Sequence, residues 1–171
     1  DLRDLSRQRE SLLSQMMALK CDMKRLLPLT FPELEKLTGV FTKSILKLVS
    51  CFPSARAIVQ ADPSEIRQLL MDHSMGRNST KTTQAIILAA RSSVGTTSPS
   101  RELIIKQKAD VLIHLEAHLK ELTAMMIELC RSDMGDDIDI MTSLRGIGEK
   151  TATNFLIEMG GDIQKFNDHK K

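Results

Sequence analysis

Two stretches of the sequence place apolar residues at alternating steps of three and four. In the first stretch only an arginine interrupts the pattern, whose positions are Leu2, Leu5, Arg9, Leu12, Met16, Leu19, Met23 and Leu26. The same spacing returns late in the chain, at Ile105, Lys108, Leu112, Leu115, Leu119, Leu122, Met126 and Leu129. Such a heptad rhythm is typical of helices that pack along a coiled-coil seam.

The two stretches are therefore predicted to form long helices over residues 2–27 and 99–131. Pro28 and then Pro32 are expected to end the first helix, because proline lacks an amide donor and clashes with the preceding turn. Ser98-Pro99-Ser100 supplies a capped start for the second helix. Two helices with matching seams pair most simply in an antiparallel way, with the intervening chain forming a tip. Pairing with a second chain is the alternative, and the sequence leaves both open.

The tip, about residues 28–98, is predicted to be a series of short helices. They are expected to begin near Phe31 and to cover residues 42–49, 54–60, 62–72 and 79–94. Aromatic residues make up only 3% of the chain, so Leu, Ile, Val and Met must fill the core, which suits helix-on-helix packing. The expected fold class is all-α, with long antiparallel coiled-coil helices and a small helical tip, followed by a helix-hairpin-helix.

Composition excludes several classes of protein and site. No apolar run approaches the ~20 residues of a membrane span, and the start has no signal-peptide character, so a cytoplasmic protein without a membrane partner is expected. Three cysteines without C-x-x-C spacing are interpreted as free, buried thiols. His114 and His118 lie four residues apart but off the seam, so they are interpreted as solvated, and no metal site is predicted.

The most informative residues lie near the end of the chain, where Gly146-Ile147-Gly148 separates two amphipathic stretches. This order is that of a helix-hairpin-helix, in which the glycines permit a tight turn and a close approach by a phosphate. The second helix then presents free amide groups and the positive end of its dipole. The predicted nucleic-acid-binding residues are Gly146, Ile147, Gly148, Lys150 and Thr151, with Ile147 turned inward to lock the hairpin.

The alternative is a hairpin that serves packing alone or contacts only protein. The acidic residues just upstream favour this alternative, because they repel a phosphate backbone: Asp133, Asp136, Asp137 and Asp139. Residues 133–171 contain five basic and eight acidic side chains, whereas a strong sequence-independent binder of DNA usually has a basic face.

Three segments resemble a known family. The strings Leu144 to Ala152 and Leu156 to Phe166 are similar to the opening of the C-terminal domain of insertion-sequence transposases that carry an RNase H-like four-acid N-terminal domain, the family that also contains site-specific DNA invertases. Leu2 to Leu12 resembles the segment with which the coiled coil of that family begins. This chain has Arg145 where the family often has proline, and Met159-Gly160-Gly161 in place of Ile-Gly, and neither change removes a hairpin glycine.

The resemblance implies a fragment of a transposase or recombinase that acts in DNA transposition by a mobile element. Residues 1–132 would be the arm with its tip, and residues 133–171 the helix-hairpin-helix that opens a truncated C-terminal domain. The metal-binding acids are then expected before Asp1 and the serine nucleophile beyond Lys171, so no residue of this chain is nominated as catalytic. The divalent metal is expected for that missing catalytic domain, and no cofactor is expected in the fragment.

The partners implied by the resemblance are DNA, a guide RNA and a second copy of the chain bound through the arm, in the cytoplasm of a prokaryote at the nucleoid. Two other functions stay open. One is a helical homodimerisation or assembly module whose hairpin is structural. The other is a repair or recombination protein with an unrelated hairpin pair, which the match at residues 2–12 disfavours.

Overall fold

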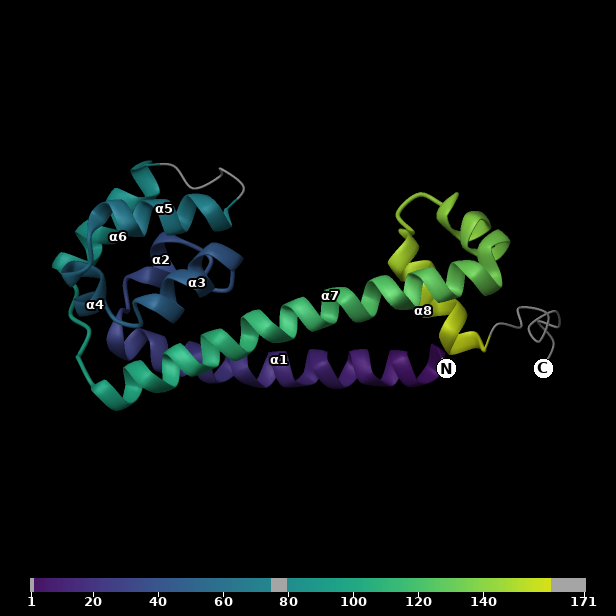
Figure 1. Ribbon diagram of the computed structural model, residues 1–171, viewed down its shortest axis with the longest axis horizontal. Helices are drawn as coiled ribbons and strands as arrows, with labels where there is room; N and C mark the ends of the chain where they lie inside the picture. Colours follow the sequence, from purple (N-terminus) through teal and green to yellow (C-terminus); the bar gives the residue numbers. More distant parts are fainter. Residues whose placement is uncertain (1, 75–79, 161–171) are drawn as a thin grey trace. The chain divides into compact units, whose positions relative to one another are not determined.

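The computed structural model describes residues 2–74 and 80–160 (Figure 1). Within these residues every regular element is a helix and no strand occurs, so the predicted all-α fold class is confirmed. The helices are α1 (Leu2–Thr30), α2 (Leu34–Leu37), α3 (Lys43–Cys51), α4 (Ala55–Gln60), α5 (Pro63–His73), α6 (Thr80–Arg91), α7 (Pro99–Thr142) and α8 (Glu149–Met159).

The chain forms two compact units, which we call the tip unit and the hairpin unit. The tip unit consists of residues 15–116, and the hairpin unit of residues 1–14 and 117–171. Each of the long helices α1 and α7 therefore contributes one part to each unit. The division expected from the sequence, an arm over residues 1–132 and a hairpin segment over residues 133–171, stays a prediction.

In the tip unit, α1 and α7 lie side by side in opposite directions. Lys20 of α1 pairs with Glu116 of α7 at 3.9 Å, and Asp22 pairs with Lys108 at 2.7 Å, so the partner number falls as the number along α1 rises. Hydrogen bonds from Lys108 and Arg25, with the attraction of their charges, hold the pKa of the Asp22 carboxyl below its ordinary value. In this unit the buried seam residues are Met16, Met23, Ile105 and Leu112, whereas Leu27 and Ala109 are buried at positions next to the predicted seams.

Two expectations about the arm are wrong. Helix α1 does not end at Pro28 but continues to Thr30. Pro28 lies in the last turn, where it removes only one helical hydrogen bond. The Leu27 carbonyl beside it accepts from the Phe31 amide at 2.8 Å and from the Thr30 hydroxyl at 3.2 Å. In α7, Leu129 is 42% exposed and Cys130 is buried instead, because the segment beyond α7 covers the Cys130 face.

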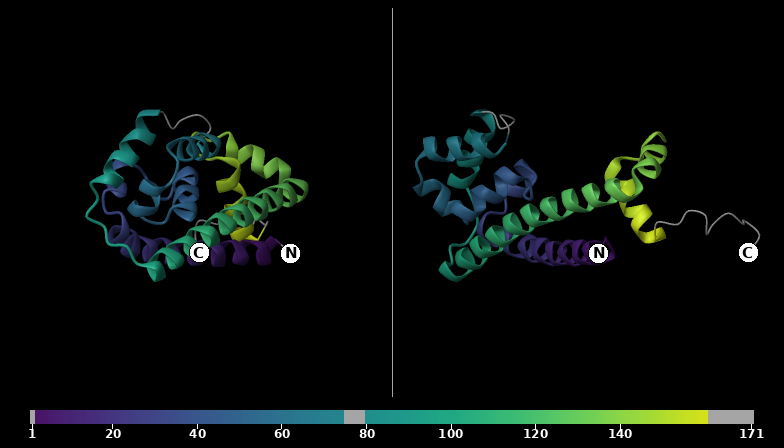
Figure 2. Two further views of the ribbon diagram at one scale, coloured as in Figure 1. Left: turned by 60° about the vertical axis from the view of Figure 1, so that its left-hand side comes forward. Right: turned by 45° about the vertical axis from the view of Figure 1, so that its right-hand side comes forward.

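The short helices of the tip unit follow the sequence closely, and Figure 2 shows them gathered together. Helix α3 buries more side chains than any other short helix and packs against α5, while α4 packs against α6. Ser54 caps α4 by accepting from the Ala57 amide at 3.1 Å, and Asp62 caps α5 by accepting from the Ser64 amide at 3.1 Å. Helix α6 ends at Arg91 rather than at residue 94, and the predicted start of this helix at Ser79 lies outside the described residues.

The segment that leaves α6 is tied to the end of α1. The Thr96 amide donates to the Leu29 carbonyl at 2.8 Å, and the Thr96 hydroxyl donates to the same oxygen at 3.1 Å. Gly95 lies against the backbone of Thr30, so closely that a Cβ at this position would be 2.6 Å from the Thr30 carbonyl carbon. Glycine is therefore required here by the close approach of two backbones.

Glu33 makes a second tie between the same parts of the tip unit. Its carboxylate accepts from the Ser93 hydroxyl at 2.6 Å and from the Val94 amide at 3.2 Å. Partial burial raises the pKa of Glu33, but these hydrogen bonds, with help from Lys36, outweigh burial and hold the pKa below its ordinary value of 4.5.

Two further expectations concern cysteines and membranes. Cys21 and Cys51 are exposed, which corrects the expectation of buried thiols, and only Cys130 of the three is buried. Cys21 lies on the outer face of α1, and Cys51 is the last residue of α3. Among the described residues, no helix combines the length and the apolar character that crossing a bilayer requires.

Candidate nucleic-acid interface

Helix α7 bends inside the hairpin unit. Met134 has φ −139° and ψ 39°, which is not helical, so α7 consists of a long limb and a short limb on either side of this residue. The long limb thus ends close to Arg131, where the helix was predicted to end, and the short limb leads toward α8 (Figure 2). Helix α8 packs back onto both limbs around four fully buried side chains, Cys130, Ile138, Ala152 and Leu156.

A tight turn joins the short limb to α8. The Ile147 amide donates to the Leu144 carbonyl at 3.1 Å, and Gly146 adopts a φ of +97°, which L side chains rarely adopt. Ile147 is half-buried and packs against the core cluster around Cys130, so the prediction that it turns inward is confirmed. On either side of the turn, Leu144 lies beyond the short limb and is exposed, and Phe155 faces outward on α8.

The first turn of α8 is open. Gly148 is the N-cap residue and offers no side chain to the helix, whose Thr151 and Ala152 amides donate to the Gly148 carbonyl at 2.9 and 3.0 Å. The amides of Glu149 and Lys150 precede the first helical hydrogen bonds and point along the positive end of the dipole. Apart from its two chain neighbours, no described residue has an atom within 4 Å of the position that a Cβ on Gly148 would take.

The five residues nominated from the sequence therefore lie together around one turn. Gly146 and Gly148 shape the backbone, Ile147 anchors it, and the side chains of Lys150 and Thr151 are exposed beside the open amides. The arrangement can accept an anion through backbone N–H groups, with one lysine and one hydroxyl near them.

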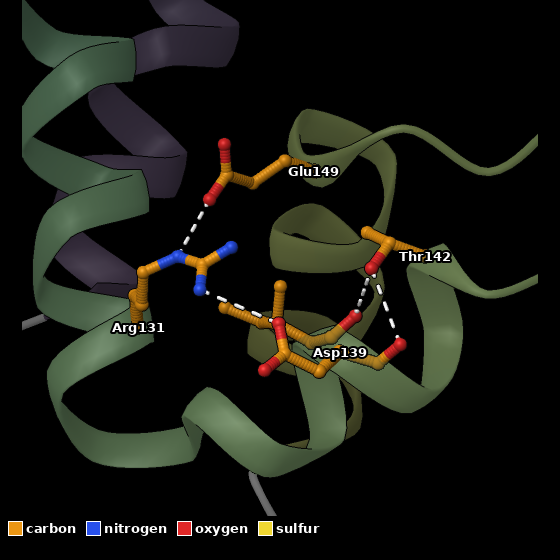
Figure 3. Close-up of polar contacts among 5 residues, drawn as sticks. Arg131, Asp139, Thr142 and Glu149 are labelled. Carbon is orange, nitrogen blue, oxygen red and sulfur yellow. Dashed lines mark hydrogen bonds and ion pairs between the residues drawn. The ribbon is translucent and has the colours of Figure 1, made fainter.

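A charged network that the sequence did not indicate lies behind this turn (Figure 3). Arg131, on the long limb of α7, donates from Nε to Oε1 of Glu149 at 2.7 Å and pairs through Nη1 with Oδ1 of Asp139 at 3.3 Å. The hydrogen bond and charge of Glu149, with a smaller contribution from Asp139, raise the pKa of Arg131. Because Arg131 and Glu149 are 18 residues apart, no local spacing pattern could have paired them.

The surroundings of the hairpin are acidic. Residues 131–160 contain six carboxylates and three basic side chains, which are Arg131, Arg145 and Lys150. Of the four aspartates noted in the sequence, Asp139 is paired with Arg131, and Asp133 and Asp136 are exposed. A long-range attraction for a polyanion is therefore weak here, and affinity for a phosphate has to come from the turn itself.

Other candidate side chains do not join the hairpin site. His114 and His118 are exposed on α7, and His114 Nδ1 lies 2.7 Å from the Asp110 carbonyl oxygen. Within residues 2–74 and 80–160, no three His, Cys, Asp or Glu side chains gather as metal ligands do. Burial raises the pKa of the Cys130 thiol, as do the charges of Asp133 and Asp137, against a smaller opposite effect of Thr153.

Comparisons of the chain with protein-family models, with curated proteins and with solved structures each gave no match.

Proposed function

We propose that this chain supplies the arm and hairpin of a DNA transposase or recombinase of the insertion-sequence family described above, and that the hairpin binds a nucleic-acid backbone. The observation that carries the proposal is the open first turn of α8, where no side chain caps the helix and a Cβ on Gly148 would meet no neighbour. Backbone amides at such a turn bind phosphate without reading the bases.

Each nominated residue has a distinct part in this proposal. Gly146 permits the backbone to reverse at a positive φ, and Gly148 leaves room for a phosphate oxygen to reach the amides. Lys150 adds a positive charge on the exposed face, and Thr151 adds a hydroxyl donor. Ile147 fixes the turn to the core of the hairpin unit and does not itself contact the ligand.

The role of the arm rests on its exposed apolar side chains and on the family resemblance. Met17 on α1 and Leu103 on α7 are more than half exposed, and several other apolar side chains are partly uncovered along the two helices. A second copy of the chain would cover such side chains in a homodimer. The guide RNA, and the location in the cytoplasm of a prokaryote at the nucleoid, follow from the resemblance alone.

A second candidate function is favoured by the charge of the hairpin unit. Residues 131–160 contain six carboxylates and three basic side chains. This acidic balance suits a contact with protein better than a contact with a phosphate backbone. In this reading the chain is a helical assembly module, and Gly146-Ile147-Gly148 is a structural joint.

The experiment that separates the two functions changes the charge or adds a methyl group at the hairpin and measures the binding of DNA. Binding of a short DNA duplex is measured by fluorescence anisotropy at low and moderate salt for the chain and for Lys150→Glu, Gly148→Ala and Lys120→Glu. Lys120 is exposed on α7 in the same unit, so its variant makes the same change of charge away from the hairpin.

The proposal expects Lys150→Glu to weaken binding about tenfold and to reduce the slope of log affinity against log salt by about 1, as loss of one phosphate contact does. Gly148→Ala should weaken binding because its methyl group meets the ligand, and should lower stability by no more than about 1 kcal/mol, since alanine is a poorer N-cap residue than glycine. If Lys150→Glu and Lys120→Glu have the same effect, and Gly148→Ala binds as the unmodified chain does, the hairpin is a structural joint.

A further inference from the structure

We infer that Arg131 is a positioning residue for the hairpin, which holds the Glu149 carboxylate away from the open amides of α8 and so keeps them available to a phosphate. This inference rests on the proposed function, because it concerns the same turn. It assigns a part in binding to a residue outside the hairpin motif, on the other side of the bend in α7.

Glu149 is the first residue of α8, so it carries an anionic group at the positive end of the helix. A carboxylate in the first turn is attracted to the same amides that would bind a phosphate. In the structure this carboxylate is instead bound by the Arg131 guanidinium, with Nε at 2.7 Å from Oε1 (Figure 3). Arg131 therefore pairs with the anionic side chain of the residue that begins α8.

The guanidinium has a second partner that fixes its direction. Asp139, on the short limb of α7, accepts from Nη1 at 3.3 Å, so Arg131 is held from both sides of the bend. The geometry thus connects the long limb, the short limb and the first residue of α8 through one side chain. Because a guanidinium is planar and donates in fixed directions, a lysine cannot reproduce both contacts in this geometry.

Stability alone does not account for the network. The side chains of Arg131, Asp139 and Glu149 are 50%, 67% and 41% exposed, and ion pairs with this exposure contribute little to the stability of a fold. The apolar cluster around Cys130 and Leu156 already holds α8 against α7. Replacing Arg131 is therefore expected to change the charge next to the α8 amides and to leave the stability of the fold nearly unchanged.

A double-mutant cycle tests the inference with the whole chain and a short DNA duplex. Arg131→Met should weaken binding about three- to fivefold, since a free carboxylate then competes at the helix start. Glu149→Gln should bind at least as tightly as the unmodified chain. In the Glu149→Gln background, Arg131→Met should weaken binding less than about twofold, because no competing carboxylate remains. Lys120→Met, which removes a charge from the same unit, should show no such coupling to Glu149→Gln.

The outcomes separate this inference from the proposed function. If Arg131→Met weakens binding equally in both backgrounds, Arg131 acts only as a general positive charge and the inference is overturned, while loss of binding in Lys150→Glu still supports the phosphate site. If Lys150→Glu is silent, the phosphate site and the role of Arg131 fall together. If Arg131→Met lowers the melting temperature, Arg131→Lys is used in its place. The lysine variant keeps the positive charge but cannot make both contacts of the guanidinium, so the same coupling to Glu149→Gln is expected.

Discussion

Replacing Gly95 with alanine tests how the tip unit closes onto α1. A Cβ there would lie 2.6 Å from the Thr30 carbonyl carbon and closer still to its oxygen. Neither group is the end of a flexible side chain, so the segment that carries Gly95 must move and lengthen the two hydrogen bonds from Thr96 to Leu29. Overpacking costs ~1–3 kcal/mol and a weakened hydrogen bond ~0.5–1.5 kcal/mol, so the free energy of unfolding should fall by about 2–4 kcal/mol.

The assay is urea denaturation followed by circular dichroism, with Gly39→Ala as the matched control. A Cβ on Gly39 makes an ordinary contact of 3.4 Å with the Thr42 methyl group, so this variant should differ from the unmodified chain by less than about 1 kcal/mol. Equal urea midpoints for the two variants would refute the reasoning. They would mean that α1 and the segment after α6 do not approach each other as closely as the structure has them.

Three other predictions concern stability. Gly146→Ala should lower the free energy of unfolding by about 1–2 kcal/mol because its φ is +97°, whereas Gly148→Ala should lower it by no more than ~1 kcal/mol, the cost of alanine in place of glycine at an N-cap, both measured by thermal melting. Leu112→Ala and Ile138→Ala each remove a fully buried side chain and should cost ~2–5 kcal/mol, with hydrogen exchange placing the first loss in the tip unit and the second in the hairpin unit. Because the pKa of Glu33 is lowered in the folded chain, its contribution to stability is present above pH 4.5 and is lost as the pH falls through the lower folded pKa. Glu33→Gln should therefore make the urea midpoint depend less on pH in this acidic range.

The arm could be predicted because a heptad pattern places an apolar residue on the same face of the helix at every third or fourth position. Each of Met23, Ile105 and Leu112 is buried, and the loss of one position to Arg9 does not disturb the spacing. The ends of the helices were less predictable, since they depend on single residues. Pro28 stays inside α1 because the last turn tolerates it, and Leu129 is exposed because the core cluster forms on the Cys130 face instead.

The hairpin could be predicted only in part. The requirement for glycine at Gly146 follows from the turn, and the inward position of Ile147 follows from its apolar side chain. The pairing of Arg131 with Glu149 could not be predicted, because a contact between exposed charges on two helices leaves no periodic signal in the sequence. The open space at Gly148 could not be predicted either, because it depends on what the rest of the fold leaves uncovered.

The two hairpin glycines therefore differ in a way that gives a last prediction. No contact with residues 2–74 or 80–160 requires glycine at position 148, where the backbone has φ −88° and ψ 163°, as an N-cap residue does. Aspartate or asparagine at this position would cap α8 with a side-chain oxygen and should stabilise the hairpin by about a few tenths of a kcal/mol over glycine. The same oxygen would then occupy the amides that the proposed phosphate needs.

Gly148→Asp and Gly148→Asn should accordingly melt no lower than the unmodified chain and yet bind a DNA duplex more weakly. The loss should be larger for Gly148→Asp, because its charge repels the backbone as well as blocking the amides. Gly148→Asn is the matched control, since it caps the helix without adding a charge. If both variants melt higher and bind DNA as the unmodified chain does, the amides of α8 take no phosphate, and the openness of this turn serves a contact with protein.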